Sequence, residues 1–225
     1  MRTVDLRSDT TTLPTDEMRQ AITGSELGDD VFRGDPTVNK LQDLAAQQMG
    51  KEAALLVPSG TMANLVSILT HCGRGAEVIL GNKAHTYKYE RGGISAYGSI
   101  HSTQIPNKDD GTMRLEDIRA AIRGIDDHFP ETKLICLENT HNVCGGAPLS
   151  GAYTKEVADI ARTNNIKMHI DGARIFNAAV AQGVDVKELV EDADSMSFCM
   201  SKGLAAPVGS VICGSKDFID QARGI

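Results

Sequence analysis

The sequence predicts an α/β fold in which a mostly parallel sheet is covered by helices on both faces. Short apolar runs alternate along the chain with segments whose apolar residues recur at helical spacing. Glycine-containing turns separate these segments, and no internal repeat or low-complexity tract interrupts them. Several polar residues directly follow apolar runs. They are therefore expected at the sheet edge where open α/β sheets bind ligands.

The predicted helices and strands divide most of the chain between them. Strands are predicted at 77–80, 99–105, 133–137, 166–170 and 195–199, and in the apolar run that ends at Gly214. Helices are predicted at 13–23, 37–49, 62–70, 86–90, 115–124, 153–164, 174–182, 186–191 and 217–223. Residues 53–57 are interpreted as a short connector. We expect an N-terminal arm at 1–15 and one large domain at 16–225.

Composition and charge narrow the class of protein. The chain has 225 residues, of which 41% are hydrophobic and 24% are charged, as in soluble globular proteins. The net charge of −7 argues against nucleic-acid or anionic-membrane partners, which favour basic surfaces. No apolar run approaches membrane-spanning length, and the N-terminal residues lack the apolar core of a signal peptide. The five cysteines include no C-x-x-C pair, so we expect reduced, mostly buried thiols in a cytoplasmic protein without a metal site.

One lysine lies where an amine nucleophile is useful. Lys202 follows an apolar run and is flanked by Ser201 and Gly203 at the mouth of a predicted strand. Partial burial and nearby cations disfavour the charged form of such a lysine, which leaves its amine able to react. The ordinary alternative is a solvated loop lysine, which describes most lysines.

Four further positions are individually ambiguous. Asp171 and Arg174 follow a strand and form either a ligand-binding pair or a structural ion pair. Gly60 and Thr61 precede a helix whose first amides suit a phosphate, although Thr61 also fits an ordinary N-cap. His85 follows another strand, where a structural histidine is the commoner outcome.

Together these residues meet the requirements of pyridoxal 5'-phosphate. This cofactor needs an amine, an anion facing its ring nitrogen, phosphate donors and a group over its ring. Lys202 offers the amine, Asp171 the anion, and Gly60 with Thr61 the phosphate cradle, while His85 is suited to stacking. The predicted large domain is therefore interpreted as a pyridoxal-phosphate-binding domain.

These residues lie within stretches that resemble one enzyme family. The chain is similar to the low-specificity L-threonine aldolases, which are fold-type-I pyridoxal-phosphate enzymes close to the β-eliminating lyases. The resemblance extends over nearly the whole chain in the expected order. Its motifs are DLRSDT (5–10), GDDVF with GDPT (28–37), EAALLVPSGTMAN (52–64), LENTHN (137–142), HIDGARIFNA (169–178) and FCMSKGLAAPVGS (198–210).

The resemblance implies cleavage of threonine, allo-threonine or related β-hydroxy-α-amino acids to glycine and an aldehyde. It also implies roles for individual residues. Lys202 joins the cofactor, Asp171 pairs with the ring nitrogen, Arg174 contacts the ring-oxygen side, Gly60 and Thr61 hold the phosphate, and His85 stacks on the ring. Ser8 lies near the substrate carboxylate, His141 or His85 takes the β-hydroxyl proton, and Tyr89 and Glu90 have supporting roles.

The resemblance also implies a homo-oligomer, a dimer or a tetramer, with sites at subunit interfaces. Family members continue past the position of Ile225 with a smaller domain that supplies an arginine for the substrate carboxylate, so we expect that domain to be missing here. Two alternatives follow. One is another pyridoxal-phosphate enzyme, a β-eliminating lyase or a transaminase. The other is an impaired remnant that retains only cofactor binding.

Overall fold

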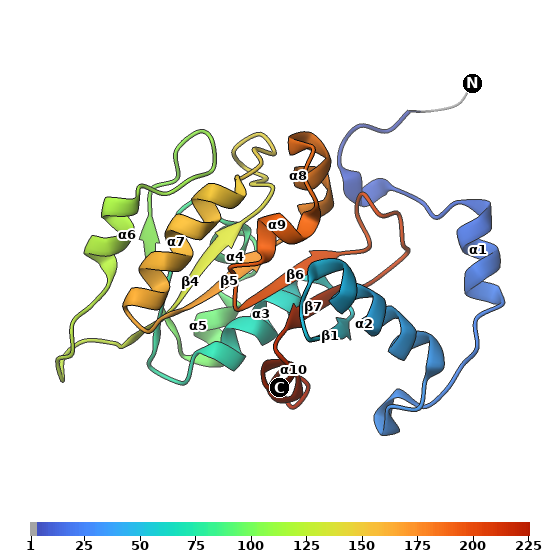
Figure 1. Ribbon diagram of the computed structural model, residues 1–225, viewed down its shortest axis with the longest axis horizontal. Coiled ribbons are helices and arrows are strands. Elements are labelled where there is room, and N and C mark those ends of the chain that lie inside the picture. Colours follow the sequence, from blue (N-terminus) through green and yellow to red (C-terminus); the bar gives the residue numbers. More distant parts are fainter. Residues whose placement is uncertain (1–3) are drawn as a thin grey trace.

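The computed structural model describes residues 4–225 and has at its centre a seven-stranded sheet with strand order β1-β7-β6-β5-β4-β2-β3 (Figure 1). Its neighbours are parallel except where β7 pairs antiparallel with β6 and β1, which confirms the mostly parallel sheet. The strands are β1 (Ala53–Val57), β2 (Glu77–Gly81), β3 (His101–Ile105), β4 (Thr132–Glu138), β5 (Lys167–Asp171), β6 (Ser195–Cys199) and β7 (Ser210–Gly214).

Strand β1 corrects one prediction. Residues 53–57 are not a connector, because each of them pairs antiparallel with β7, from Ala53 with Gly214 to Val57 with Ser210. The run AALLV is short and follows α2 closely, so its local pattern did not distinguish a strand from a link. Because β7 is antiparallel to both neighbours, β1 runs in the same direction as β6. The carboxyl ends of β1 to β6 therefore lie along one edge of the sheet.

The helices agree with the predicted segments apart from one addition. They are α1 (Asp16–Thr23), α2 (Pro36–Met49), α3 (Gly60–His71), α4 (His85–Lys88), α5 (Gly93–Gly98), α6 (Leu115–Ala121), α7 (Gly151–Thr163), α8 (Ile175–Gln182), α9 (Val186–Val190) and α10 (Lys216–Ala222), with 3-10 turns η1 (Asp9–Thr11) and η2 (Asp30–Phe32). Helix α5 was not predicted. Gly92, in the left-handed region at φ 66°, ends the preceding turn and lets a new helix begin at Gly93.

Helices cover both faces of the sheet. One face is packed by α2, α6, α7, α8 and α9, which share the largest apolar cluster with β4, β5 and β6. The other face is packed by α3, α5 and α10, whose apolar residues form two smaller clusters with the sheet. Strands β2, β6 and β7 are buried at every position, as expected when both faces are covered.

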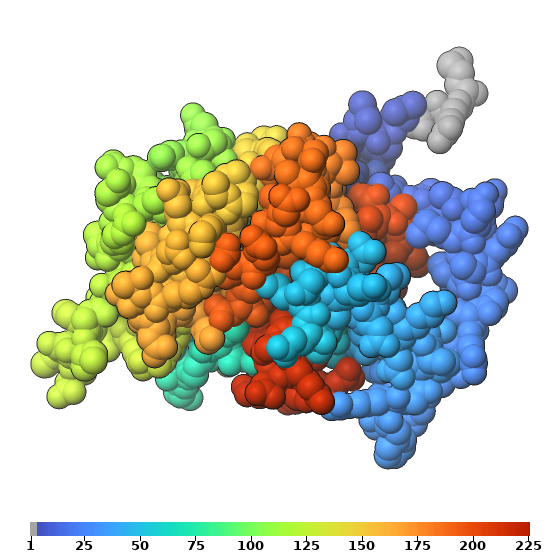
Figure 2. All heavy atoms as spheres, viewed as in Figure 1, coloured from blue at the N-terminus to red at the C-terminus, as the bar shows by residue number. Residues whose placement is uncertain are grey.

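The N-terminal segment stands apart from this core. None of its described residues before Asp35 is buried, and α1 has no buried residue at all. Figures 1 and 2 show this blue segment along one side of the molecule, with α1 standing away from the sheet. Four of the five cysteines are buried, Cys144 is half-buried, and all five are free thiols. None of the helices within residues 4–225 is long and apolar enough to cross a membrane.

Candidate active site

The polar residues singled out by sequence follow the carboxyl ends of several strands. Glu138, the last residue of β4, is in register with Asp171, the last residue of β5. Asp171 is in turn paired with Ser197 of β6. Further along the same edge, Val57 and Cys199 each pair with Ser210. The carboxyl ends of β1 and β6 therefore flank the first residue of β7. The sheet therefore brings five chain segments to one edge.

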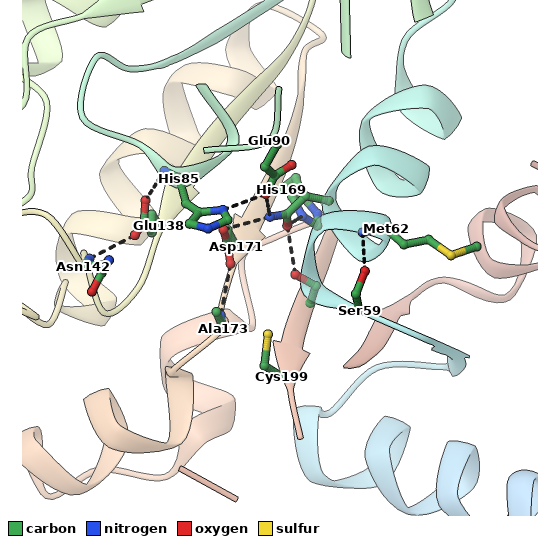
Figure 3. Close-up of polar contacts among 12 residues, drawn as sticks. Ser59, Met62, His85, Glu90, Glu138, Asn142, His169, Asp171, Ala173 and Cys199 are labelled. Carbon is green, nitrogen blue, oxygen red and sulfur yellow. Dashed lines mark hydrogen bonds and ion pairs between the residues drawn. The ribbon is translucent and has the colours of Figure 1, made fainter. Parts of the chain in front are cut away.

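Asp171 is a buried carboxylate held by two nitrogen donors. Its Oδ1 accepts a hydrogen bond from the backbone N–H of Ala173 at 3.1 Å. Its Oδ2 accepts one from Nδ2 of Asn64, on α3, at 2.8 Å. Burial without such donors would strongly disfavour a carboxylate. The two bonds fix the direction of the carboxylate in the site (Figure 3).

His85 and Glu90 form a second polar pair next to Asp171. Nδ1 of His85 lies 2.8 Å from Oε1 of Glu90 (Figure 3). The same oxygen accepts a hydrogen bond from Nδ2 of Asn64 at 2.8 Å. The hydrogen bond to Glu90 raises the pKa of His85 above its ordinary value. Burial raises the pKa of Glu90, and the hydrogen bonds from His85 and Asn64 oppose that effect. Two N–H donors facing Oε1 favour an ionised Glu90, with a proton on Nδ1 of His85.

Three of these side chains are close enough together to bind one metal ion. One ligand atom each from His85, Glu90 and Asp171 lie within 4.8 Å of one another. However, the amide N–H groups of Asn64 already donate to both carboxylates. These bonds, with that between His85 and Glu90, account for the closeness of the three groups by hydrogen bonding within the protein.

Glu138 connects His85 to the turn that carries His141. Its Oε2 accepts the backbone N–H of His85 at 2.6 Å, and its Oε1 accepts the backbone N–H of Asn142 at 2.9 Å (Figure 3). Burial and the charge of Asp171 raise the pKa of Glu138 to about 7. Glu138 therefore carries a proton for part of the time near neutral pH.

His141 is buried without a hydrogen-bond partner for its ring. Neither Nδ1 nor Nε2 has a partner among the described residues, and Nε2 lies 4.0 Å from Oε2 of Glu138. Burial lowers the pKa of His141, which favours the neutral ring. Buried polar atoms nearly always have partners, so two unsatisfied ring nitrogens in one side chain indicate a place for water or a ligand group.

Lys202 is half-buried in the turn between β6 and β7. Its Nζ lies 3.4 Å from Sγ of Cys199. The same sulfur leaves no room for a side chain at Gly60, because a Cβ there would lie 2.7 Å from it. A side chain does not fit between these segments without movement. The sulfur of Cys199 therefore lies between Lys202 and the start of α3 and is close to both.

The start of α3 differs in one detail from the prediction. The N-cap is Ser59 and not Thr61, because Oγ of Ser59 accepts the N–H of Met62 at 3.2 Å (Figure 3). The amides of Gly60 and Thr61 precede the first residue that can donate within the helix, and Thr61 is exposed. These amides and the Thr61 hydroxyl remain suited to binding a phosphate at a helix N-terminus.

The N-terminal arm contacts the site at two points. Arg174 donates from Nε to Oδ2 of Asp9 at 2.6 Å and from a terminal nitrogen to Oδ1 at 2.7 Å. This pairing lowers the pKa of Asp9. Thr12 donates from Oγ1 to the backbone carbonyl of Lys202 at 2.6 Å. Ser8 is exposed, and its Oγ accepts from the N–H of Thr10 at 3.2 Å.

The predicted site residues therefore form three linked groups. In the first, hydrogen bonds run from Asp171 through Asn64 and Glu90 to His85. In the second, Lys202 and Gly60 both lie close to Cys199. In the third, Arg174 binds Asp9, which follows Ser8 in the arm. Oε2 of Glu138 lies between the two histidines: it accepts the backbone N–H of His85 and is 4.0 Å from Nε2 of His141. In this structure the guanidinium of Arg174 donates to the carboxylate of Asp9. Contact of Arg174 with the ring-oxygen side of the cofactor therefore stays a prediction.

Several residues that organise the site were not singled out from sequence. Asn64, Glu138 and Asp9 lie inside recognised motifs, yet their motif positions do not reveal their partners. Asn64, for example, bonds residues 26 and 107 positions away. An amide side chain within a predicted helix of mostly apolar residues was the one available signal for Asn64.

Comparisons with known proteins agree on one family. A sequence model described as "Beta-eliminating lyase" matches residues 5–225. "Low-specificity L-threonine aldolase 1" of Arabidopsis thaliana is 55% identical, over 100% of this chain and 64% of its own length. "Low specificity L-threonine aldolase" of Escherichia coli (strain K12) is 49% identical, over 97% of this chain and 65% of its own length. The chain thus spans less than two thirds of each relative.

Solved structures show the same fold at low sequence identity. A threonine aldolase from Leishmania major aligns with a TM-score of 0.82 and 20% identity, covering 96% of this chain and 64% of that protein. A putative L-allo-threonine aldolase from Listeria monocytogenes aligns with a TM-score of 0.78 and 20% identity, covering 91% of this chain and 56% of that protein. These likenesses concern the arrangement of the sheet and its helices.

Proposed function

This chain belongs to the beta-eliminating lyase family, and we propose that its protein is a pyridoxal-phosphate-dependent aldolase. The proposed reaction cleaves L-threonine, L-allo-threonine and related β-hydroxy-α-amino acids to glycine and an aldehyde. Relatives with 49% and 55% identity carry the name of that activity. They are longer than this chain, so the activity is proposed for the protein as a whole.

The donors and acceptors at the sheet edge fit pyridoxal phosphate. Gly60 is half-buried and Thr61 is exposed, so the backbone at the start of α3 is accessible to a bound group. The free amides there suit a phosphate, and the buried carboxylate of Asp171 suits a protonated ring nitrogen. The amine of Lys202 would hold the cofactor, and His85 would lie over its ring. When bound, this cofactor accepts the electron pair left by a breaking Cα–Cβ bond.

The two histidines are proposed to have different protonation states. The hydrogen bond that His85 donates to Glu90 raises the pKa of His85 and engages Nδ1, which makes His85 the weaker candidate for the base. Burial favours neutral His141, whose ring nitrogens both lack partners among residues 4–225. We therefore assign removal of the β-hydroxyl proton to His141, directly or through a water. The buried, unpartnered ring of His141 at the edge that also carries Lys202 and Asp171 is the observation that carries the proposal.

The remaining roles concern binding and orientation. Ser8 lies next to Asp9 in the arm that engages Arg174, which supports a place for Ser8 near the substrate carboxylate. Arg174 itself is proposed to face the ring-oxygen side once the cofactor is present. Glu138 would orient His85 and the turn around Asn142 through its two backbone hydrogen bonds.

A cofactor-binding measurement tests the first part of the proposal. The purified protein mixed with pyridoxal phosphate should develop the visible absorbance of the bound cofactor, and Lys202→Ala should lose it. Lys216→Ala is the matched control, because Lys216 is exposed at the far end of β7. Absorbance that survives in Lys202→Ala, or that never develops in the wild type, contradicts the proposed cofactor site.

Product analysis tests the reaction. Incubation with threonine should release glycine and acetaldehyde, whereas a β-eliminating lyase would release ammonia and a keto acid. His141→Phe should lower glycine release by roughly a hundredfold or more while the cofactor absorbance stays, as expected when a general base is removed. Equal glycine release by His141→Phe and wild type contradicts the role of His141.

The cellular setting follows from the same proposal. We propose a homo-oligomer, specifically a homotetramer, that acts in the cytoplasm in threonine breakdown and glycine supply. The five free cysteines support a reducing compartment. The exposed apolar side chains of the N-terminal segment support association with further copies.

A further inference from the structure

A line of polar side chains, of which three are buried and His71 is half-buried, connects the site with the opposite end of α3. His71, the last residue of α3, has Nε2 2.7 Å from Oγ of Ser195. The same hydroxyl lies 2.8 Å from Nδ1 of His169. Nε2 of His169 lies 3.4 Å from Oδ1 of Asn64, whose amide nitrogen bonds Asp171. We call His71, Ser195, His169 and Asn64 the polar chain.

The direction of every hydrogen bond in the polar chain can be assigned from its site end. The amide nitrogen of Asn64 faces carboxylate oxygens of Asp171 and Glu90, each at 2.8 Å, so both of its protons are used there. Its Oδ1 must then be the acceptor for its other two partners. These are Oγ of Ser197 at 3.1 Å and Nε2 of His169. His169 therefore carries its proton on Nε2.

The assignment continues to the far end of the polar chain. Burial lowers the pKa of His169 to about 3 and that of His71 to about 4, so each ring is neutral and has one N–H. With its proton on Nε2, His169 accepts at Nδ1 from the hydroxyl of Ser195. That hydroxyl has no second proton, so it accepts from Nε2–H of His71.

The result is a one-way series of donors that ends on two carboxylates. Hydrogen bonds in such a series polarise one another in a low-dielectric interior, which strengthens the last donor. That last donor is the amide of Asn64 on Oδ2 of Asp171. The first member, His71, lines a surface cavity of about 570 Å³, so the polar chain extends from that cavity to the site.

We propose that His71, Ser195 and His169 are positioning residues that act through Asn64 to hold Asp171 as an oriented carboxylate. They touch neither substrate nor cofactor. That this carboxylate faces the ring nitrogen of the cofactor rests on the proposed function. The proton assignment itself does not, because it follows from the protein's own contacts.

Histidine NMR tests the assignment without any cofactor. Ring ¹⁵N shifts of labelled protein should show His169 and His71 both as neutral rings protonated on Nε2. Ser195→Ala should release His71 from a single tautomer and leave His169 protonated on Nε2. Ser67→Ala is the matched control, because Ser67 is a buried serine of α3 whose hydroxyl has no partner in the described part of the chain, and it should change neither ring. A proton on Nδ1 of His169 in the wild type overturns the proposal.

A comparison of two cofactors tests the effect on Asp171. Pyridoxal phosphate and its 1-deaza analogue, which has C–H in place of the ring nitrogen, differ only where Asp171 is proposed to act. The wild type should prefer pyridoxal phosphate, and Ser195→Ala should lower that preference by roughly fivefold, the size of one lost hydrogen bond. His71→Phe, which keeps an aromatic ring against Phe218, should lower it in the same direction.

The outcomes separate this inference from the proposed function. Equal weakening of both cofactors in Ser195→Ala, with the preference intact, overturns the positioning role and leaves a structural one. Unchanged preference in both variants also overturns it. Failure of the wild type to bind either compound counts against the proposed function, and the histidine tautomers then decide the polar chain alone.

Discussion

At the scale of single residues, Asn64 is where the polar contacts of the site converge. Its nitrogen donates to Glu90 and Asp171, and its oxygen accepts from Ser197 and His169. All four hydrogen bonds available to an amide side chain are made, and the residue is buried. A fully satisfied buried amide fixes its neighbours, since any rearrangement leaves a polar group unpaired.

Gly60 leads to a prediction about packing. Gly60→Ala should destabilise the protein by roughly 1–3 kcal/mol, the usual cost of overpacking, because the new Cβ would lie 2.7 Å from Sγ of Cys199. It should also weaken cofactor binding through displacement of Lys202. Urea unfolding and cofactor titration measure the two effects. Gly73→Ala is the control, since a Cβ there meets nothing within 4 Å, and equal stability of the two variants would rule out the clash.

Glu138 leads to a prediction about pH. Its pKa in the folded protein is about 7, above the ordinary 4.5, so the folded state holds a proton that the unfolded state releases earlier. Its ionisation therefore costs stability as the pH rises from 4.5 through 7. Relative to Glu138→Gln, the wild-type free energy of unfolding should fall by roughly 1–3 kcal/mol between about pH 5 and pH 8.

Infrared spectroscopy checks the titration of Glu138 directly. A protonated carboxyl band should disappear with a midpoint near pH 7 and be absent from Glu138→Gln. Glu131→Gln is the control, because Glu131 is exposed and should leave the band unchanged. A band that persists in Glu138→Gln means that another buried acid is responsible.

At the scale of elements, the N-terminal arm acts as a strap across the site. None of the arm residues from Val4 onward is buried, yet Asp9 holds Arg174 and Thr12 holds the carbonyl of Lys202. Two side chains therefore determine where this segment lies. Arm position and site geometry are linked through the same two residues, Arg174 and Lys202.

Release of the arm is predicted when the Asp9 contact is removed. Asp9→Asn should lose the charge-assisted pair with Arg174, cost roughly 1–2 kcal/mol, and speed tryptic cleavage after Arg7 and Arg19. The control is Asp5→Asn, whose partner Arg7 lies in the arm itself. Equal cleavage rates in both variants and wild type would mean that Asp9 does not hold the arm.

At the scale of the whole molecule, the sheet provides the framework and the N-terminal segment remains uncovered. The apolar clusters account for both faces of the sheet, whereas Leu6 and Phe32 remain 90% and 84% exposed. Leu27 and Val31 are similarly exposed in the same part of the chain. A group of large apolar side chains in solvent is typical of an association surface.

Self-association through the N-terminal segment is the corresponding prediction. Light scattering should give a mass above the 24.1 kDa of one chain, and Phe32→Asp with Leu27→Asp should lower it. Ile125→Asp is the control, because Ile125 is an exposed apolar residue far from that segment in sequence. A mass of 24.1 kDa for the wild type would contradict the prediction.

Local patterns were sufficient for most elements and for the chemical types at the site. Helix α2 illustrates this, since Asp35 caps its amides, Pro36 begins it and Gly50 ends it at φ 63°. The pattern failed at β1, where a strand depends on pairing with β7 more than 150 positions later. It also misplaced the cap of α3 by two residues, because Ser59 and Thr61 are equally suitable as residue types.

The sequence by itself determined six of the seven strands, all helices but α5, and the candidates Lys202, Asp171, His85 and Gly60, because periodicity and turn residues act over short distances. Only the tertiary structure decided their partners. Asn64 between Asp171 and Glu90, Asp9 on Arg174, and Cys199 against Gly60 each join segments far apart in the chain. Such contacts arise when the strand ends meet at one edge of the sheet, and no local pattern records which side chains then face one another.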